Sequence, residues 1–199
     1  MNRMALAALA ALALTQAAPA ARASDAQGVF AVEGIATESC SIFIQERDLK
    51  SDRYFMFGGW VDGYVTAINQ YNVDTYDITT WETTDLLMAL IDRHCRANPD
   101  DEFIGVVAAM AKKLNPDRLR AQSPVIDIVA GDKQGKMYQE VLVRVQQALI
   151  DQGFYTGAAD GQFGPQTQQA IAAFQTAKQF EATGFPDQIT LLALLRPGP

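Results

Sequence analysis

Four side chains in the last quarter of the chain have the types and spacing of a small binding site. Tyr155 carries an aromatic ring that can stack on the flat face of a sugar-like ring, and Gln162 and Gln166 carry amides that both donate and accept hydrogen bonds. Asp160 adds a carboxylate, although in a glycine-rich turn it more often bonds its own loop amides. The set predicts recognition of a ligand rather than a reaction.

Three predicted helices position these side chains. Apolar residues recur at three- and four-residue spacing from Val141 to Leu149, which predicts an amphipathic helix that ends at Gly153. A second helix is expected to open at Pro165, because a first turn does not need the missing N–H. A third is expected to start from Asp187 as its N-cap.

The turns that follow the first two helices look alike. Thr156-Gly157-x-x-Asp160 and Thr183-Gly184-x-x-Asp187 suggest one turn design used twice. We expect Gly157, Gly161 and Gly164 to supply positive φ angles or close backbone approach.

Residues 141–195 as a whole resemble the small three-helix peptidoglycan-binding domain of many bacterial wall hydrolases and wall-associated proteins. The resemblance rests on the residues around Gln146, the run from Gly157 to Thr167, Phe174-Gln175, and the run from Thr183 to Thr190. It implies that residues 138–196 form a domain whose partner is peptidoglycan, with either the glycan or the stem peptide as the group contacted. It implies no reaction.

Few residues offer catalytic chemistry. His94 is the only histidine, so the multi-histidine zinc sets of wall amidases cannot be assembled. Cys40 and Cys95 are predicted to form a disulfide in an oxidising compartment, which leaves no thiolate nucleophile. Glu38-Ser39 matches the Glu-Ser pair of lytic transglycosylases, but the glycine-containing motif that follows it in that family is absent. We expect no catalytic residue, metal or cofactor, with a transglycosylase-like wall hydrolase as one alternative and a carboxylate-pair glycosidase still open.

The N-terminus has the pattern of a secretory signal peptide. Arg3 precedes ten apolar residues, Ala5–Leu14, and Ala21-Arg22-Ala23 is a small-x-small cleavage site. We expect residues 1–23 to be removed after Ala23, leaving a periplasmic protein with no membrane insertion.

Charge excludes some partners. The chain has a net charge of −7, and loss of Arg3 and Arg22 with the signal peptide would lower it to −9. An acidic protein of this size is a poor partner for nucleic acid or for anionic membranes.

Residues 29–115 are predicted to form a separate helical domain with one disulfide. The order Cys40 … Trp60-x-x-Gly63-Tyr64 … Ile91-Asp92-x-x-Cys95-x-x-Asn98-Pro99 … Phe103-x-x-Val106-Val107 resembles the small helical proteins grouped with the periplasmic acid-stress chaperone HdeA. It also resembles the related immunity proteins that neutralise wall-degrading effectors. The resemblance implies a non-catalytic fold that binds other proteins. The expected helices lie at 40–45, from 51 or 52 to 69–72, from 85 to 98, and from a cap at Asp100 or Asp101 to 114.

The loop at 73–85 is polar with interspersed aromatic residues, and Trp81 is the predicted contact residue for another protein. Prolines and glycines predict a linker at 116–137, in which the apolar run 124–129 is either a short strand or a docking segment. The expected fold is therefore all-α, with two small helical domains. The expected function is to anchor an adaptor-like domain for an unidentified envelope protein to the wall. The alternative is an acid- or stress-activated chaperone tethered to the wall.

Overall fold

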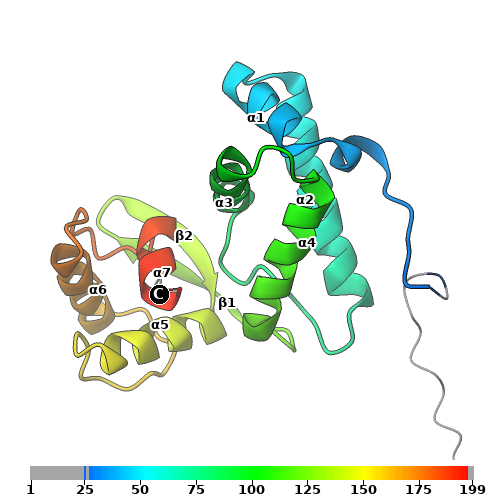
Figure 1. Ribbon diagram of the computed structural model, residues 1–199. Helices are drawn as coiled ribbons and strands as arrows, with labels where there is room; N and C mark the ends of the chain where they lie inside the picture. Colours follow the sequence, from blue (N-terminus) through cyan, green and yellow to red (C-terminus); the bar gives the residue numbers. More distant parts are fainter. Residues whose placement is uncertain (1–24, 26, 197–199) are drawn as a thin grey trace, which may run out of the picture. The chain divides into compact units, whose positions relative to one another are not determined.

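The computed structural model describes residues 25 and 27–196, so the predicted signal peptide lies outside the described residues. Residues up to Val32 form a unit of their own, in which the Asp25 carboxylate accepts hydrogen bonds from the backbone N–H groups of Gln27 and Val29. The chain from Glu33 onward forms a second unit, which is mostly helical (Figure 1).

Side-chain caps begin three of the four N-terminal helices. The hydroxyls of Ser39, Ser51 and Thr83 each accept a hydrogen bond from the backbone N–H three residues later. The predicted helix at 51–72 is continuous through its three glycines. The elements of this part are a 3-10 turn, η1 (Gly34–Thr37), and the helices α1 (Cys40–Leu49), α2 (Asp52–Tyr71), α3 (Thr84–Ala97) and α4 (Phe103–Leu114).

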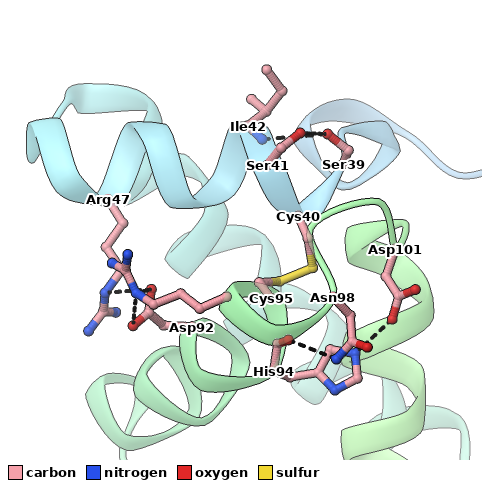
Figure 2. The surroundings of a disulfide bond; sticks show 11 residues. Ser39, Cys40, Ser41, Ile42, Arg47, Asp92, His94, Cys95, Asn98 and Asp101 are labelled. Atoms are coloured by element: carbon pink, nitrogen blue, oxygen red, sulfur yellow. Dashed lines mark hydrogen bonds and ion pairs between the residues drawn. A yellow bond between two sulfur atoms is a disulfide. The ribbon is translucent and has the colours of Figure 1, made fainter.

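The predicted cap of α4 is wrong. The helix follows Glu102, whose side chain makes no capping bond. Asp101 is engaged elsewhere. Its carboxylate lies 2.7 Å from Nε2 of His94 (Figure 2). Its backbone carbonyl accepts the N–H of Cys40 at 2.8 Å. The contact with the start of α1 therefore decides where α4 begins.

The Cys40–Cys95 disulfide joins α1 to α3 and confirms the predicted pairing (Figure 2). Beside it, the fully buried rings of Phe43, Phe57 and Phe103 pack with centroids 4.6 to 5.2 Å apart. The disulfide joins α1 to α3, and the aromatic cluster joins α1, α2 and α4. Together they hold the four N-terminal helices in one unit.

The segment predicted as a linker contains a β-hairpin. After the short turn η2 (Asn115–Asp117), β1 (Val125–Ala130) pairs antiparallel with β2 (Lys133–Tyr138), and Val125 lies opposite Tyr138. The apolar run is therefore a strand, and buried Ile128 and Met137 join the core of the C-terminal helices. With this hairpin as the only sheet among the described residues, the all-α prediction is confirmed.

Three helices complete the chain, coloured yellow to red in Figure 1. Their predicted boundaries are confirmed: Gly153 has a φ of 78° after the first helix, Pro165 opens the second, and the Asp187 carboxylate caps the third. The helices are α5 (Gln139–Asp151), α6 (Pro165–Ala177) and α7 (Gln188–Leu195). They bury one apolar core formed by residues such as Leu142, Leu149, Ile171, Phe174 and Leu191.

Candidate functional site

A buried amide holds the first turn of the C-terminal domain. The Gln146 side chain is fully buried, and its Nε2 lies within 3.2 Å of Oδ1 of Asp160, the carbonyl of Gln162 and Oγ1 of Thr167. Its Oε1 accepts the N–H of Gly161 at 2.7 Å. Both polar atoms of this amide therefore have partners, so its burial leaves no hydrogen-bonding group unsatisfied.

A second buried amide holds the second turn in the same way. Nε2 of Gln175 lies within 3.3 Å of Oγ1 of Thr183, the carbonyl of Phe185 and Oγ1 of Thr190. Its Oε1 accepts the N–H of Gly184 at 2.8 Å. The two helix–turn units are therefore structural repeats.

The repeat exists, but the predicted pairing of its residues is wrong. Asp160-Gly161 corresponds to Thr183-Gly184, since both glycines have a φ near 70° and donate to the buried amides. Gly157 does give close approach, to the Tyr155 ring, whereas Gly164 has neither a positive φ nor a close neighbour. The Thr-Gly-x-x-Asp pattern at Gly157 predicts the wrong partner for Gly184, because the spacing of glycines does not show which backbone N–H donates to the buried amide oxygen.

Gly161 should not tolerate a side chain. A Cβ there would lie 2.6 Å from Cγ of Gln139 and 3.1 Å from its carbonyl oxygen, in addition to the strain of a positive φ. We expect Gly161→Ala to lower the free energy of unfolding by about 3 kcal/mol, against about 1 kcal/mol for Gly131→Ala, which shares the positive φ but has open space. Urea unfolding of the two variants tests this, and equal losses would contradict it.

The first turn presents three of the four predicted site residues to solvent. Asp160, Gln162 and Gln166 are exposed, while Tyr155 is half-buried against the core with its ring over Gly157. Hydrogen bonds from the backbone N–H of Gln162 and from the Gln146 amide hold the pKa of the Asp160 carboxyl below its usual value. Asp160 therefore stays ionised. As predicted from the sequence, it accepts a hydrogen bond from an amide of its own loop, the backbone N–H of Gln162.

The second turn is covered by residues Thr80–Thr83, which we call the strap. Gln188 donates from Nε2 to the carbonyl of Trp81 at 2.7 Å, and its Oε1 accepts the N–H of Thr83 at 3.0 Å. A cavity of about 270 Å³ remains between the strap, the hairpin and the turn, lined in part by Trp81, Lys136 and Phe185. Trp81, predicted to contact another protein, thus contacts the C-terminal domain of its own chain.

An ion pair fastens the strap. The Glu82 side chain is 1% exposed, and Oε1 accepts hydrogen bonds from Nε and Nη2 of Arg196 at 3.0 and 2.8 Å. The Arg196 guanidinium also lies 5.8 Å from the centroid of the Trp81 ring and pairs with Asp117. Sequence reasoning missed Glu82, Gln188 and Arg196, because nothing local marks an acid and a base 114 residues apart as partners.

The N-terminal helices carry a larger hollow. A groove of about 750 Å³ runs between α3 and α4 and reaches α7. Apolar residues such as Leu90, Val106, Met110 and Leu192 line it, together with charged or ionisable residues: Arg93, His94, Asp101, Glu102, Lys113 and Arg196. A groove of this size and composition is suited to binding another molecule.

The residues considered for catalysis have structural partners. Glu38 forms an ion pair with Arg53 at 2.7 Å, and its neighbour Ser39 caps α1. Within residues 25 and 27–196, no three His, Cys, Asp or Glu side chains are grouped as a metal site would require. Nor does this part of the chain contain a helix long and apolar enough to cross a membrane.

The C-terminal part of the chain is thus a module of three helices, in which the first turn is exposed to solvent and the second is covered by the strap. Comparison with known proteins names this module: residues 139–194 match the family model of the peptidoglycan binding domain. The match confirms the resemblance of the C-terminal part and does not extend to residues 29–115.

A wider similarity links the chain to one curated protein. It is 29% identical over 138 residues to the N-acetylmuramoyl-L-alanine amidase CwlM of Mycobacterium tuberculosis. The alignment covers 65% of this chain, more than the matched domain alone, but the chain spans only about a third of that relative's length. No solved structure matches the chain.

Proposed function

We propose that this protein is a non-catalytic peptidoglycan-binding protein of the periplasm, whose N-terminal helices engage another envelope protein. The observation that carries the proposal is the open first turn of a domain that matches the peptidoglycan-binding family. The disulfide supports an oxidising compartment, where such bonds form and persist.

The first turn is the proposed contact surface. The side-chain amides of Gln162 and Gln166 make no hydrogen bond with the residues that the structure describes. The half-buried Tyr155 ring packs over Gly157, close to the start of the turn. The second turn has its polar groups engaged by the strap. Exposed, unpaired amides are the groups that suit a ligand rich in amide bonds.

We place the envelope-protein contact at the groove between α3 and α4. Its lining combines apolar side chains with charged ones, as protein contact surfaces do. Arg93 and Lys113 of that lining are exposed and have no ion-pair partner among the described residues, so both remain available to a partner.

Catalysis is the competing function, because the curated relative is named an amidase. Amidase chemistry on a metal commonly uses several histidines, and this chain has one, His94, which pairs with Asp101. The two residues that would support transglycosylase chemistry have other partners: the Glu38 carboxylate pairs with Arg53 of α2, and the Ser39 hydroxyl caps α1. We therefore propose a binding role. Clearing of a sacculus suspension by the purified protein, lost in Glu38→Gln, would show the opposite.

Binding is tested by co-sedimentation with purified sacculi. We expect the wild type to pellet and Tyr155→Ala and Gln162→Ala each to weaken retention by about fivefold, the effect of one lost contact of about 1 kcal/mol. Gln169→Ala, an exposed glutamine of α6 outside the turn, is the matched control and should pellet normally. Because Tyr155 is half-buried, unfolding temperatures are measured in parallel. Unchanged retention of both variants would rule out this turn as the contact.

A further inference from the structure

We propose that the groove between α3 and α4 binds a short amphipathic α-helix of a partner protein, with basic residues at its N-terminal end and acidic residues toward its C-terminal end. The inference rests on the proposed function, which places an envelope-protein contact at this groove, and it names the element that the groove receives. The spacing, the size and the charge of the lining residues support it.

The groove lies between two antiparallel helices. A short loop joins α3 to α4, and at their other ends Arg196 pairs with Glu82, which precedes α3, and with Asp117, which follows α4. The lining residues of α4 recur at three- and four-residue spacing: Glu102, Gly105, Val106, Ala109, Met110 and Lys113. Glu102 and Lys113 lie about 17 Å apart along the helix axis, so a helix of about three turns matches the groove in length.

Small residues leave room for the backbone of another helix. Ala97 of α3 and Gly105 and Ala109 of α4 line the groove and are exposed. A Cβ built at Gly105 would have no heavy atom within 4 Å. Glycine inside a helix is less stable than alanine, and no close contact within this chain requires it here. A glycine at this position does allow a second helix to approach closely.

Charges of opposite sign lie at the two ends of the groove. Near the α3–α4 loop the lining contains Asp101, which pairs with His94, and Glu102 (Figure 2). The opposite end contains Lys113 and Arg196. Glu102 and Lys113 are both exposed, and neither forms an ion pair with a residue in the described part of the chain. The groove therefore has one end that attracts cations and one that attracts anions.

This separation of charge favours a helix over other occupants. An α-helix has a partial positive charge at its N-terminus and a partial negative charge at its C-terminus, so it would lie with its N-terminus at Glu102 and its C-terminus at Lys113. Arg93, exposed and between the two ends, offers a further cation to an acidic residue of that helix. An extended strand has only a small net dipole, and a lipid acyl chain has no charge to pair.

A pair of designed peptides tests the role of charge. Both have about 14 residues and an apolar stripe at three- and four-residue spacing. The first has lysines in its first turn and glutamates in its last turn, and the second has the same composition with these residues alternating along its polar face. We expect the purified protein to bind the first about fivefold more tightly, measured by fluorescence anisotropy. Equal affinities, or no binding of either peptide, would overturn the inference.

Helix content of the free peptides cannot produce this result. Lysines in the first turn and glutamates in the last oppose the helix dipole, so the first peptide is the poorer helix former in solution. Replacing one central polar residue of the first peptide by proline should weaken binding at least about tenfold, because proline breaks a helix but fits an extended chain. Unchanged binding of the proline peptide would mean that the occupant is extended, contrary to the inference.

Gly105→Leu separates loss of binding from loss of folding. Its side chain fills open space in the groove, so affinity for the first peptide should fall at least about tenfold. The unfolding temperature should hold or rise, because leucine is a better helix former than glycine. Gly63→Leu is the matched control, since Gly63 is equally open but lies on α2 outside the groove, and it should bind like the wild type. Full affinity in Gly105→Leu would place the peptide elsewhere.

Two measurements on the protein alone complete the test. Sedimentation velocity should show a monomer, and a dimer that Gly105→Leu dissociates would assign the groove to a second copy of the chain and contradict the inference. Co-sedimentation with sacculi tests the proposed wall binding separately, because Gly105→Leu should pellet like the wild type. If the peptides fail to bind but the protein pellets, only the inference fails. If the wild type does not pellet, wall binding itself is wrong.

Discussion

Gln146→Glu should destabilise the protein by about 3 to 5 kcal/mol at pH 7, the usual effect of a buried charge without a partner. The substitution keeps the shape of the side chain but replaces its only donor with an ionised oxygen. That oxygen would face the Asp160 carboxylate and the Gln162 carbonyl. Thr167 gives no relief, because its hydroxyl already donates to the Gln162 carbonyl at 3.2 Å.

Gln175→Glu is the matched comparison. The corresponding oxygen would face the carbonyl of Phe185, but also the hydroxyls of Thr183 and Thr190, which can turn to donate. No carboxylate is among its contacts. We expect its loss of stability to be smaller by about 2 kcal/mol. Gln169→Glu, on the exposed face of α6, should change little. Equal stability of Gln146→Glu and the wild type at pH 7 would show that the buried network is unimportant.

The loss in Gln146→Glu should shrink as the pH falls. Burial beside Asp160 raises the pKa of the introduced carboxyl above its unfolded value, so the penalty is full above the folded pKa and disappears as the pH falls below the unfolded pKa of about 4. Asp160 behaves in the opposite direction. Its folded pKa is lowered, so the stability it contributes is present above its unfolded pKa and is lost only as the pH falls through the folded value. Urea unfolding at pH 7 and pH 5 should show the variant approaching the wild type.

Removal of the disulfide should cost about 4 kcal/mol on the chain-entropy account. The bond closes a loop with a sequence separation of 55 residues, and it ties α1 to α3. We expect the double variant Cys40→Ala/Cys95→Ala to show this loss in urea unfolding, and the reduced wild type to match it. A loss of this size is a large part of the stability of a small domain.

Backbone hydrogen bonds at the start of α1 limit how much structure is lost when the disulfide is removed. Cys40 and Ser41 still donate to the carbonyls of Asp101 and Pro99, and Phe103 donates to the carbonyl of Glu38. Helix content by circular dichroism should therefore persist in the double variant at low temperature. A loss below about 1 kcal/mol would mean that these contacts, rather than the disulfide, hold α1 in place.

Local patterns in the sequence determined the helices of the C-terminal domain. The spacing of Val141, Val145 and Leu149 predicts α5, Pro165 marks the start of α6, and Asp187 caps α7. These signals act within one or two turns of helix, so they can be read without knowing the fold. The disulfide could also be predicted from the sequence, because the chain has only two cysteines.

Contacts between distant residues decided the rest. Which glycine pairs with Gly184 depends on the N–H that the buried amides of Gln146 and Gln175 accept, and glycine spacing alone favoured the wrong one. The segment predicted as a linker forms a hairpin, because Ile128 and Met137 are buried in the apolar core of the C-terminal helices. The strap contacts the second turn through hydrogen bonds between distant residues, such as Trp81 and Gln188, which are 107 residues apart. Hydrogen bonds and burial at such separations carry no periodic signature, so only the folded chain shows which turn is open to a ligand.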